Sequence, residues 1–374
     1  MPIRTLSKAI FHDYFAIAGG GERLVLTLSN HFRMPVITAF VNKKLYRDVG
    51  WIGAIRPILP SVPGKSPLTR ALAAMITFSL MPGWCAQKIE TVIYSGNYAP
   101  LARRRLECNF HVMYCHTIPR FLGDLQAEFL QSVPGYLLPS YRLMLRLYKS
   151  LYLLSVKKID LLIANSRNVR RRIKSFTGRQ SLVIYPPCDT SSFKFMGQDD
   201  YYLSTARLEP QKNVDRVVEA FKKMPDKRLV VVSGGSQYKK ILELASEASN
   251  VHVLGWVSDR KLKELIGRCI ATVYVPTNED FGMSPVESMA AGKPVIGVSS
   301  GGLTETIIHG RTGYLLPENW TQEDMVRAVK YLNAAKAFEL RRFCEERAEC
   351  FDESIFLEKM AKVIKGEMPY VRDE

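Results

Sequence analysis

The stretch ATVYVPTNEDFGMSPVESMAAGKPVIGV spans residues 271–298 and contains a strand, a turn, a helix and a second strand in direct succession. Its β-branched and aromatic ends predict strands over 271–275 and 295–298. Between them, residues 281–284 predict a turn and residues 285–291 a helix. Two strands of one sheet that are joined through a helix pair in parallel. The stretch therefore predicts an α/β domain.

The same alternation extends over the rest of the chain. Further strands are predicted at 10–11, 36–40, 91–94, 110–114, 161–164, 182–185, 202–205, 229–233 and 251–254. Helices are predicted between several of them, at 22–32, 139–157, 167–176, 214–223, 239–248 and 260–266. This pattern is typical of doubly wound parallel sheets with helices on both faces. A chain of 374 residues is too long for one compact core and fits two such domains.

The sequence Tyr185-Pro186-Pro187 predicts the junction between the domains, because two prolines end a strand and disfavour a helix just before them. We expect an N-terminal domain over 1–187 and a C-terminal domain over 188–352. A final helical segment over 353–374 is expected to return to the N-terminal domain.

Positive charge is concentrated in the first half of the chain. Residues 1–190 hold 26 basic and 9 acidic side chains, whereas the remainder holds 26 basic and 27 acidic ones. A basic domain joined to a nearly neutral one indicates that the first meets an anionic surface. Nucleic acid and anionic lipid both qualify. No aromatic platform or reading module surrounds the arginine triplets at 103–105 and 170–172, so we expect no nucleic acid partner.

Cysteine usage and hydropathy bound the compartment. The seven cysteines include no CxxC pair, which argues against a disulfide framework or a zinc site and favours a reducing compartment. We expect no signal peptide, and no apolar run reaches the roughly 18 residues of a membrane span.

Two apolar segments interrupt the alternation in the basic half. Residues 68–81 are apolar and compatible with a helix, and residues 136–156 mix leucine, methionine and tyrosine with Arg142, Arg146 and Lys149. Helical spacing puts these three cations on one stripe. The segment is either an ordinary helix packed on a sheet or a helix lying in a membrane interface, with its apolar stripe inserted and its cations on anionic headgroups.

Chemistry-bearing side chains follow the strands of the second half. The turn at 281–284 opens a helix, whose N-terminal N–H groups can hold an anion. Glu279 and Glu287 flank it, and two carboxylates beside an anion site fit a ligand that carries vicinal hydroxyls as well as phosphate. Arg207 and Lys212 follow another strand and can bring two cations to one diphosphate.

Glycines mark close approach of a ligand to backbone elsewhere. Ser233-Gly234-Gly235 ends a strand of the second half, and Gly19-Gly20-Gly21 leads into the first helix after His12-Asp13-Tyr14. Ligands of doubly wound sheets bind outside the carboxyl ends of the strands, where all these residues fall.

Together these motifs resemble a family, the retaining nucleotide-sugar glycosyltransferases of the GT4 kind, which have the GT-B fold. Glu279 and Glu287 match its Glu-x7-Glu signature, and Arg207 with Lys212 matches its Arg-x4-Lys element. Further matches lie at 19–21, 165–166, 185–189 and 309–313. The segment 114–121 (YCHTIPRF) resembles the mannosyltransferase branch that builds O-antigen. Ala206 and Asn213 stand where glycine is usual.

The resemblance implies two doubly wound parallel-sheet domains facing a cleft, and a role for each matching residue. Arg207 and Lys212 would neutralise the departing nucleoside diphosphate without a metal ion. Glu279 would bind the donor sugar and Glu287 the ribose. His116 would reach the sugar from the acceptor side. Backbone and side chains at the following positions would bind the donor: Gly20, Gly21, Gly234, Val257, Phe281, Gly282, Met283 and Ser284.

The sequence therefore predicts a retaining hexosyltransferase that uses no cofactor. The favoured donor is GDP-mannose and the favoured acceptor a lipid-linked glycan, at the cytoplasmic face of an anionic membrane. A UDP-sugar-dependent glucosyl- or N-acetylglucosaminyltransferase of the same fold is the nearest alternative. A non-catalytic scaffold with the same fold is the alternative from another class.

Overall fold

The chain is described here from a computed structural model, which covers residues 7–16, 19–43, 46, 54–64, 66–81, 89–123, 126–131 and 133–368. It divides into two compact units. Unit 1 comprises Met1–Ile184 together with Leu357–Glu374, and unit 2 comprises Tyr185–Phe356. Cys85 lies outside the described residues, and the other six cysteines form no disulfide with one another.

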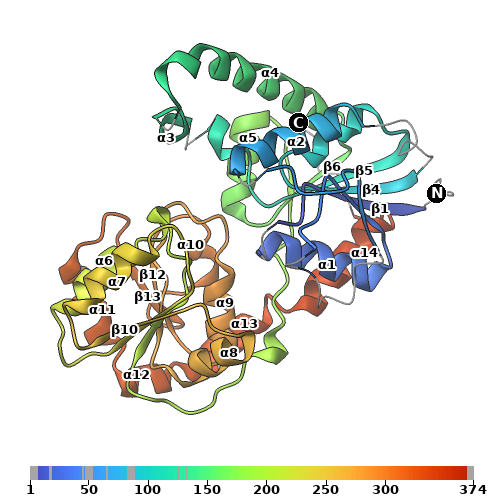
Figure 1. Cartoon of the computed structure of the whole chain (residues 1–374). Coiled ribbons are helices and arrows are strands. Elements are labelled where there is room, and N and C mark those ends of the chain that lie inside the picture. Colours follow the sequence, from blue (N-terminus) through green and yellow to red (C-terminus); the bar gives the residue numbers. More distant parts are fainter. Residues whose placement is uncertain are drawn as a thin grey trace. The chain divides into compact units, whose positions relative to one another are not determined.

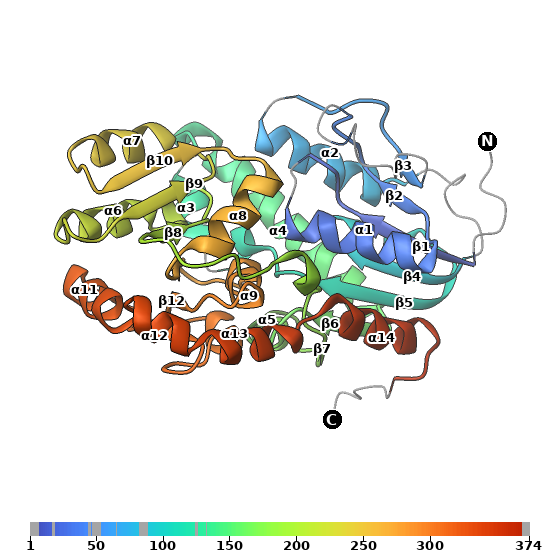
Figure 2. The same ribbon diagram turned by 90° about the horizontal axis from the view of Figure 1, so that it is seen from below.

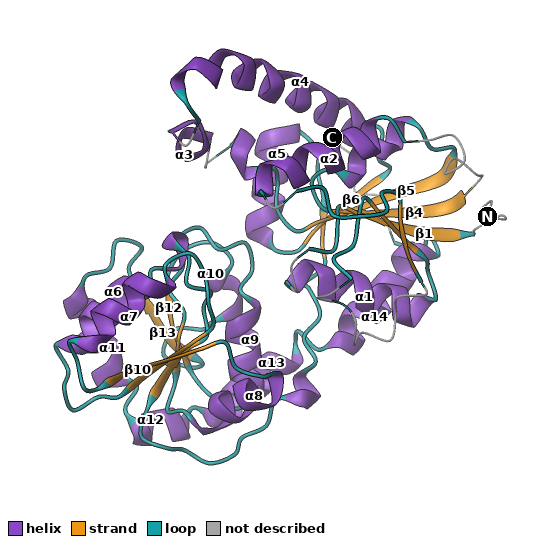
Figure 3. Ribbon diagram, in the orientation of Figure 1, coloured by secondary structure: helices purple, strands orange, loops and turns teal. Residues whose placement is uncertain are grey.

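Unit 1 is built on a seven-stranded parallel sheet with the order β3-β2-β1-β4-β5-β6-β7, of which Figures 1 and 3 label β1, β4, β5 and β6. Its strands are β1 (Lys8–His12), β2 (Val36–Thr38), β3 (Ile55–Pro57), β4 (Ile89–Ser95), β5 (Cys108–Cys115), β6 (Leu161–Ala164) and β7 (Leu182–Val183). The chain winds outward in one direction from β1 to β3 and in the other from β4 to β7. The adjacent pair β1 and β4 is therefore the switch point, where doubly wound sheets bind ligands.

Helices cover both faces of the unit 1 sheet. One face carries α1 (Gly20–Phe32) and the end of α14 (Glu353–Ile364), both in front in Figure 2. The other carries α2 (Pro67–Ser79), α4 (Leu138–Lys157) and α5 (Arg167–Thr177), above the sheet in Figure 1; the short helix α3 (Gln126–Gln131) precedes α4. Alternate strand residues Phe11, Val92 and Tyr94 pack in one buried cluster with Phe78 of α2 and Tyr152 of α4. Such alternation is what a sheet buried on both faces requires.

The solvent-exposed face of α4 does not include Tyr148 and Tyr152, which a tyrosine-rich interfacial stripe would expose. Tyr148 and Tyr152 are buried in the unit 1 core. Leu143, Leu147 and Leu154 are instead exposed, by 57%, 59% and 53%. The outward face thus joins leucines to cations, while the tyrosines hold the helix on the sheet. Within the described ranges, no helix is both long and apolar enough to cross a membrane.

Unit 2 has a six-stranded parallel sheet with the order β10-β9-β8-β11-β12-β13. Its strands are β8 (Tyr202–Ser204), β9 (Leu229–Val232), β10 (Val251–Gly255), β11 (Thr272–Val273), β12 (Val295–Val298) and β13 (Gly313–Leu316). Its helices are α6 (Val214–Lys222), α7 (Tyr238–Ser246), α8 (Asp259–Arg268), α9 (Met283–Ala290), α10 (Leu303–Thr306), α11 (Gln322–Tyr331), α12 (Ala334–Glu339) and α13 (Arg341–Glu349). Here the switch point is the pair β8 and β11.

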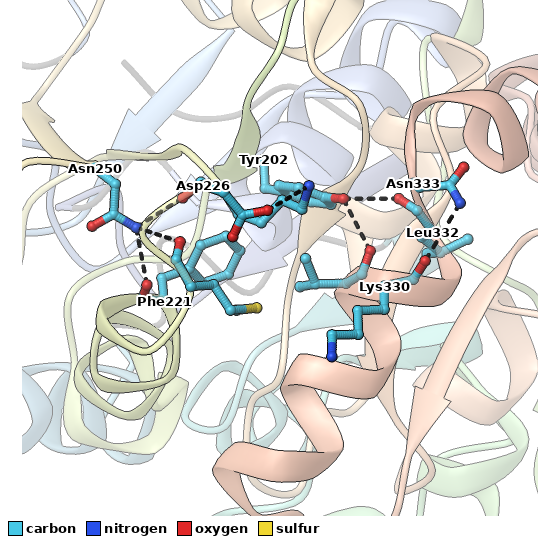
Figure 4. Close-up of polar contacts among 10 residues, drawn as sticks. Tyr202, Phe221, Asp226, Asn250, Lys330, Leu332 and Asn333 are labelled. Atoms are coloured by element: carbon cyan, nitrogen blue, oxygen red, sulfur yellow. Dashed lines mark hydrogen bonds and ion pairs between the residues drawn. The ribbon is translucent and has the colours of Figure 1, made fainter.

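The buried Tyr202 and the half-buried Asn250 hold the ends of unit 2 helices through hydrogen bonds (Figure 4). The Tyr202 hydroxyl donates to the carbonyl oxygens of Val329 and Leu332, at 3.1 and 3.0 Å, at the end of α11. The Asn250 amide donates to three carbonyl oxygens around the end of α6, at 2.8–2.9 Å. These bonds satisfy carbonyls that a helix end leaves without a partner. They fix the scaffold from which the switch-point loops emerge.

Candidate active site

The loops that follow β8 and β11 are joined directly to each other. Leu203 pairs with Thr272, so the two loops leave the sheet side by side. The Asn213 amide donates to the carbonyl oxygen of Val275 at 2.8 Å and to the Thr277 hydroxyl at 3.1 Å. In return, the Thr277 N–H donates to the carbonyl oxygen of Gln211 at 2.8 Å. The two loops therefore form one continuous ledge at the switch point.

A three-residue polar cluster lies on this ledge. Lys212 Nζ is 2.7 Å from Glu279 Oε2 and 2.9 Å from the Tyr274 hydroxyl oxygen. The Tyr274 hydroxyl donates to the same carboxylate oxygen at 2.9 Å. The Lys212 and Glu279 side chains are only 14% and 18% exposed. Two of the three ammonium N–H groups are used in this cluster, which leaves the third for a ligand oxygen.

Two further charged side chains act on the same buried phenol. Burial raises the pKa of Tyr274 well above its usual value, and the charge of Glu279 and its hydrogen bond raise it further. The positive charge of Arg207 lowers this pKa, whereas the negative charge of Glu287 raises it. Arg207 is exposed and Glu287 half-buried. All four predicted charged residues thus lie within electrostatic reach of Tyr274.

The turn between Glu279 and α9 is shorter than its sequence suggests. We predicted a turn over 281–284, but Met283 and Ser284 already form the first turn of α9. Gly282 is the N-cap residue, with φ of 91°, a left-handed conformation that glycine adopts without strain. Phe281 is buried against Tyr185 and Phe351. The backbone N–H groups at the start of α9 therefore have a fixed position beside the loop that carries Glu279 and Asp280, which is called the acidic loop below.

A pair of glycines holds this acidic loop from below. A Cβ on Gly301 would lie 2.3 Å from the carbonyl oxygen of Glu279, and one on Gly302 would lie 2.4 Å from that of Asp280. The Gly302 N–H donates to the carbonyl oxygen of Glu279 at 2.8 Å. The loop can approach this closely only because both positions lack a side chain.

Two predicted donor-binding residues of unit 2, Gly234 and Val257, differ in their surroundings. Gly234 lies under Trp256, because a Cβ on Gly234 would come within 2.2 Å of the indole nitrogen. Trp256 is 76% exposed. Val257 is instead half-buried and packs against a buried cluster that includes Leu265 and Ile266 of α8. The exposed ring beside Gly234 is thus Trp256, whereas the predicted residue Val257 packs against the core.

The switch point of unit 1 carries a hydrogen-bonded chain of uncharged groups. The Ser95 hydroxyl lies 2.8 Å from Nε2 of His116 and 3.1 Å from Nδ1 of His12. A serine hydroxyl donates one proton, so one imidazole accepts it and the other donates its N–H to the serine oxygen. A Cβ on Gly21 would lie 3.6 Å from the His116 ring. Gly21, like Gly20, belongs to the first turn of α1, and Gly20 is exposed.

Burial keeps these imidazoles neutral. It lowers the pKa of His116 to about 4, and burial with the neighbouring His116 lowers the pKa of His12 to about 3. Asp13 accepts three N–H bonds from Asn97, Tyr98 and Ala99 at 2.6–2.8 Å. Its burial nevertheless raises its pKa to about 6. At neutral pH, His116 is therefore a hydrogen-bonding group and not a cation.

The two departures from the family pattern are accommodated. Asn213 has φ of 54° and ψ of 28°, in the left-handed region that asparagine tolerates better than most residues. Ala206 is not among the residues with positive φ. Among the described residues, no group of three or more His, Cys, Asp or Glu side chains is placed to hold a metal ion.

The C-terminal part of the chain matches a known family. Residues 190–350 match the family model of glycosyl transferases group 1. Among solved structures, the chain resembles HepE from Anabaena, crystallised with UDP-glucose, with a TM-score of 0.73 and 18% identity over 96% of this chain and 99% of that one. The fold is GT-B. The predicted fold, with two doubly wound parallel-sheet units, is thereby confirmed.

Curated relatives of this GT-B chain are similar at low identity. An uncharacterized glycosyltransferase of Methanocaldococcus jannaschii is 28% identical over 54% of this chain and 56% of its own length, so that alignment spans about half of the relative. The α-1,3/1,6-mannosyltransferase ALG2 of Dictyostelium discoideum is 25% identical over 87% of this chain and 89% of its own. The O-antigen chain mannosyltransferase RfbU of Salmonella typhimurium is 25% identical over 70% and 72%.

Sequence reasoning missed Tyr274 and Ser95. Tyr274 sits within the apolar run that predicts a strand, where a buried aromatic residue is the ordinary expectation. Its position next to the end of that run, just before the acidic loop, was the available signal. Ser95 ends β4 in the same way, beside the strand that ends in His12. Such polar residues can be selected as site candidates from their position alone, at the carboxyl ends of the two strands that form a switch point.

The ledge should bind a diphosphate through Lys212. We expect Lys212→Ala to weaken the binding of inorganic pyrophosphate about 10- to 100-fold, because a hydrogen bond to a charged group contributes about 1.5–3 kcal/mol. Tyr274→Phe should have a smaller effect in the same direction, since it removes one contact that orients the ammonium. Isothermal titration calorimetry measures both affinities.

Tyr202→Phe is the matched control for Tyr274→Phe. It also removes a buried hydroxyl from a strand end, but one that bonds only to carbonyls of the scaffold. Its pyrophosphate affinity should equal that of the wild type. Unchanged affinity in Lys212→Ala would contradict a diphosphate site on this ledge.

Acidification should destabilise the chain through its buried histidines. The pKa values of His12, His111 and His116 are lowered to about 3, 4 and 4, whereas unfolded histidine titrates near 6.5. The unfolded state therefore gains protons first as the pH falls from about 7.5 to about 5.5, and the free energy of unfolding falls by about 1 kcal/mol for each histidine. The raised pKa of Asp13 opposes this change but involves only one group.

Thermal unfolding at the two pH values tests this linkage. His116→Gln should reduce the drop in melting temperature by about 2–4 °C, because one titrating group is removed. His252→Gln, at an exposed position in unit 2, should leave the drop unchanged. Equal drops in wild type and His116→Gln would exclude the buried, neutral imidazole.

Proposed function

We propose that this protein is a retaining glycosyltransferase that transfers a hexose, most simply mannose from GDP-mannose, to a lipid-linked glycan acceptor. The observation that carries the proposal is the Lys212–Tyr274–Glu279 cluster at the unit 2 switch point, with Arg207 and Glu287 acting on the same phenol. Cations for a diphosphate and carboxylates for sugar hydroxyls occur together there. A nucleotide-sugar needs both kinds of group.

The chemistry assigned to this cluster is stabilisation of the leaving group. The bond from the anomeric carbon to the phosphate oxygen breaks, and the acceptor hydroxyl oxygen bonds to that carbon on the same face. The proton of the acceptor hydroxyl passes to the departing phosphate. Arg207 and the third N–H of Lys212 face the charge that develops on this phosphate. Glu279, held by Lys212 and Tyr274, is oriented toward the sugar hydroxyls, and Glu287 binds the ribose.

The names of two relatives favour mannose. ALG2 of Dictyostelium and RfbU of Salmonella are mannosyltransferases, and both align over at least 70% of this chain. A UDP-sugar remains the alternative donor, because HepE was crystallised with UDP-glucose. In either case the exposed Trp256 beside Gly234 is well suited to stack on the base.

The acceptor is assigned to unit 1. Its neutral His116, positioned by Ser95 and His12, can exchange hydrogen bonds with a sugar hydroxyl without introducing a charge. The outward face of α4 supports attachment at the cytoplasmic side of an anionic membrane. There, Arg142, Arg146 and Lys149 are interleaved with exposed leucines. Apolar side chains that enter the interface and cations that meet headgroups are the features of an interfacial helix.

Donor identity is tested by thermal shift with GDP, GDP-mannose, UDP and UDP-glucose. We expect GDP and GDP-mannose to raise the melting temperature by about 5–10 °C at about 100 times Kd, because a ligand that binds only the folded state stabilises it by about 2.7 kcal/mol. A larger shift with the UDP compounds would transfer the proposal to a UDP-sugar. No shift with any of the four would reject it.

Two variants divide the roles within the same measurement. Glu287→Ala should reduce the shift with GDP, because the ribose contact is lost. Glu279→Ala should keep the GDP shift and lose the additional shift that the sugar of GDP-mannose supplies. Equal loss of GDP affinity in both variants would contradict this division.

Membrane attachment is tested with vesicles of phosphatidylcholine and phosphatidylglycerol. The combined variant Arg142→Gln, Arg146→Gln, Lys149→Gln should bind about 100-fold more weakly than wild type, since each cation near an anionic surface contributes about 1 kcal/mol. The matched control neutralises three exposed cations of α5, which are Arg170, Arg171 and Lys174. It should retain most of the affinity, and an equal loss in both variants would leave no special role for α4.

A further inference from the structure

Unit 1 contains a large apolar cavity between α2 and α4. Its volume is about 650 Å³, within the range of small-molecule sites. Its described lining residues are aliphatic, aromatic or hydroxyl-bearing, and none of them is charged. The cavity opens to solvent, so a ligand can enter it without displacing the core. Its rim is also apolar, because Leu68, Phe129 and Leu137 are 48%, 41% and 44% exposed.

One end of this cavity adjoins the loops that carry the hydrogen-bonded residues His12, Ser95 and His116. Tyr14, Tyr98 and Phe121 line it, and they lie on the three loops that follow β1, β4 and β5. The same three loops and strand ends supply His12, Ser95 and His116. Tyr148 of α4, another lining residue, donates to the carbonyl oxygen of Asn97 at 2.7 Å and so ties the cavity wall to the β4 loop. The loops that line this end of the cavity are therefore the same ones that position His12, Ser95 and His116.

A cation stands at this same end. Arg70 of α2 is adjacent to the lining residue Ala71, and its charge acts on the Tyr14 hydroxyl, as do the carboxylates of Asp13 and Glu22. Its Nε is buried and has no hydrogen-bond partner among the described residues. A buried N–H without an acceptor is costly, and a phosphate oxygen would satisfy it. The charge excess of residues 1–190 has the same sign as this cation.

We propose that this cavity binds the hydrocarbon chain of the acceptor, a single-chain lipid phosphate of the polyprenyl phosphate type. The chain lies between α2 and α4, and its phosphate lies at the Arg70 end, which brings the attached sugar to His116. The proposed occupant has one hydrocarbon chain, in contrast to a diacyl lipid. This inference rests on the proposed function, because it names the anchor of the acceptor that the transferase would use.

Two neighbouring residues of α4 separate the cavity from the outer surface. Met144 lines the cavity, whereas Leu143 points to solvent with 57% of its side chain exposed. Met144→Trp should fill the cavity and weaken the binding of farnesyl phosphate at least tenfold, and Leu143→Trp should leave it unchanged. All variants are made in the full chain with Lys212→Ala, which weakens phosphate binding by unit 2. Calorimetry measures the affinity, with dihexanoyl phosphatidic acid and inorganic phosphate as the comparison probes.

A second cavity variant keeps the test decisive if Met144→Trp does not fold. Ala71→Phe fills the cavity from the α2 wall, and the melting temperature of each variant is recorded alongside its affinity. Weakened farnesyl phosphate binding in both cavity variants supports the proposal. Three results overturn it: no binding by the parent chain, equal weakening by Leu143→Trp, or tighter binding of either comparison probe.

Donor binding is measured separately, so that failure of the cavity proposal can be distinguished from failure of the proposed function. Met144→Trp and Leu143→Trp, made with Lys212 intact, should both give the full thermal shift with the donor. A parent chain that binds farnesyl phosphate but no nucleotide-sugar would refute the transferase and leave the lipid site. A chain that binds the donor but no farnesyl phosphate would refute the cavity proposal alone.

Discussion

The parallel pairing of β8 with β11 is the constraint on which the unit 2 site depends. Lys212 and Glu279 are 67 residues apart in the chain, yet their side chains meet because Leu203 lies opposite Thr272 in this pair. A shift of register by one residue would displace one loop by about 3.3 Å, which is more than the length of their hydrogen bond. Asn213 then locks the two loops together. The chemistry of the site is thus a property of strand register first and of the side chains second.

Unit 1 uses the same topological position for a different kind of group. Its sheet also reverses at one strand pair, β1 and β4, but the side chains there are His12, Ser95 and His116, and no ion pair to either imidazole occurs among the described residues. Burial removes the charge of the imidazoles, whereas in unit 2 the opposite charges of Lys212 and Glu279 stabilise each other. One switch point suits an anion and the other suits hydroxyl groups. The two chemistries are separated by unit.

Much of the architecture was predictable because apolar strands and amphipathic helices alternate so regularly. The strands that were missed, β3 (Ile55–Pro57) and β13 (Gly313–Leu316), are both edge strands. Edge position does not explain this, because the other two edge strands, β7 and β10, were predicted. β3 holds an arginine and a proline in three residues and so lacks the apolar run that predicts a strand. Charged site residues were found because they follow predicted strands, but the hydroxyl of Tyr274 acquires its role only from tertiary neighbours. In α4 both stripes are apolar, so periodicity could not decide that Tyr148 faces the core and Leu147 the solvent.

The glycine pair beneath the acidic loop has a consequence for protein engineering. Gly301 and Gly302 contribute no side chain to any ligand, yet they determine how deeply the backbone at Glu279 and Asp280 can settle. A chimaera that received the acidic loop without this pair would carry the right carboxylates along a displaced backbone. Transplanting the specificity of such a site therefore requires two segments that are distant in the chain to be moved together.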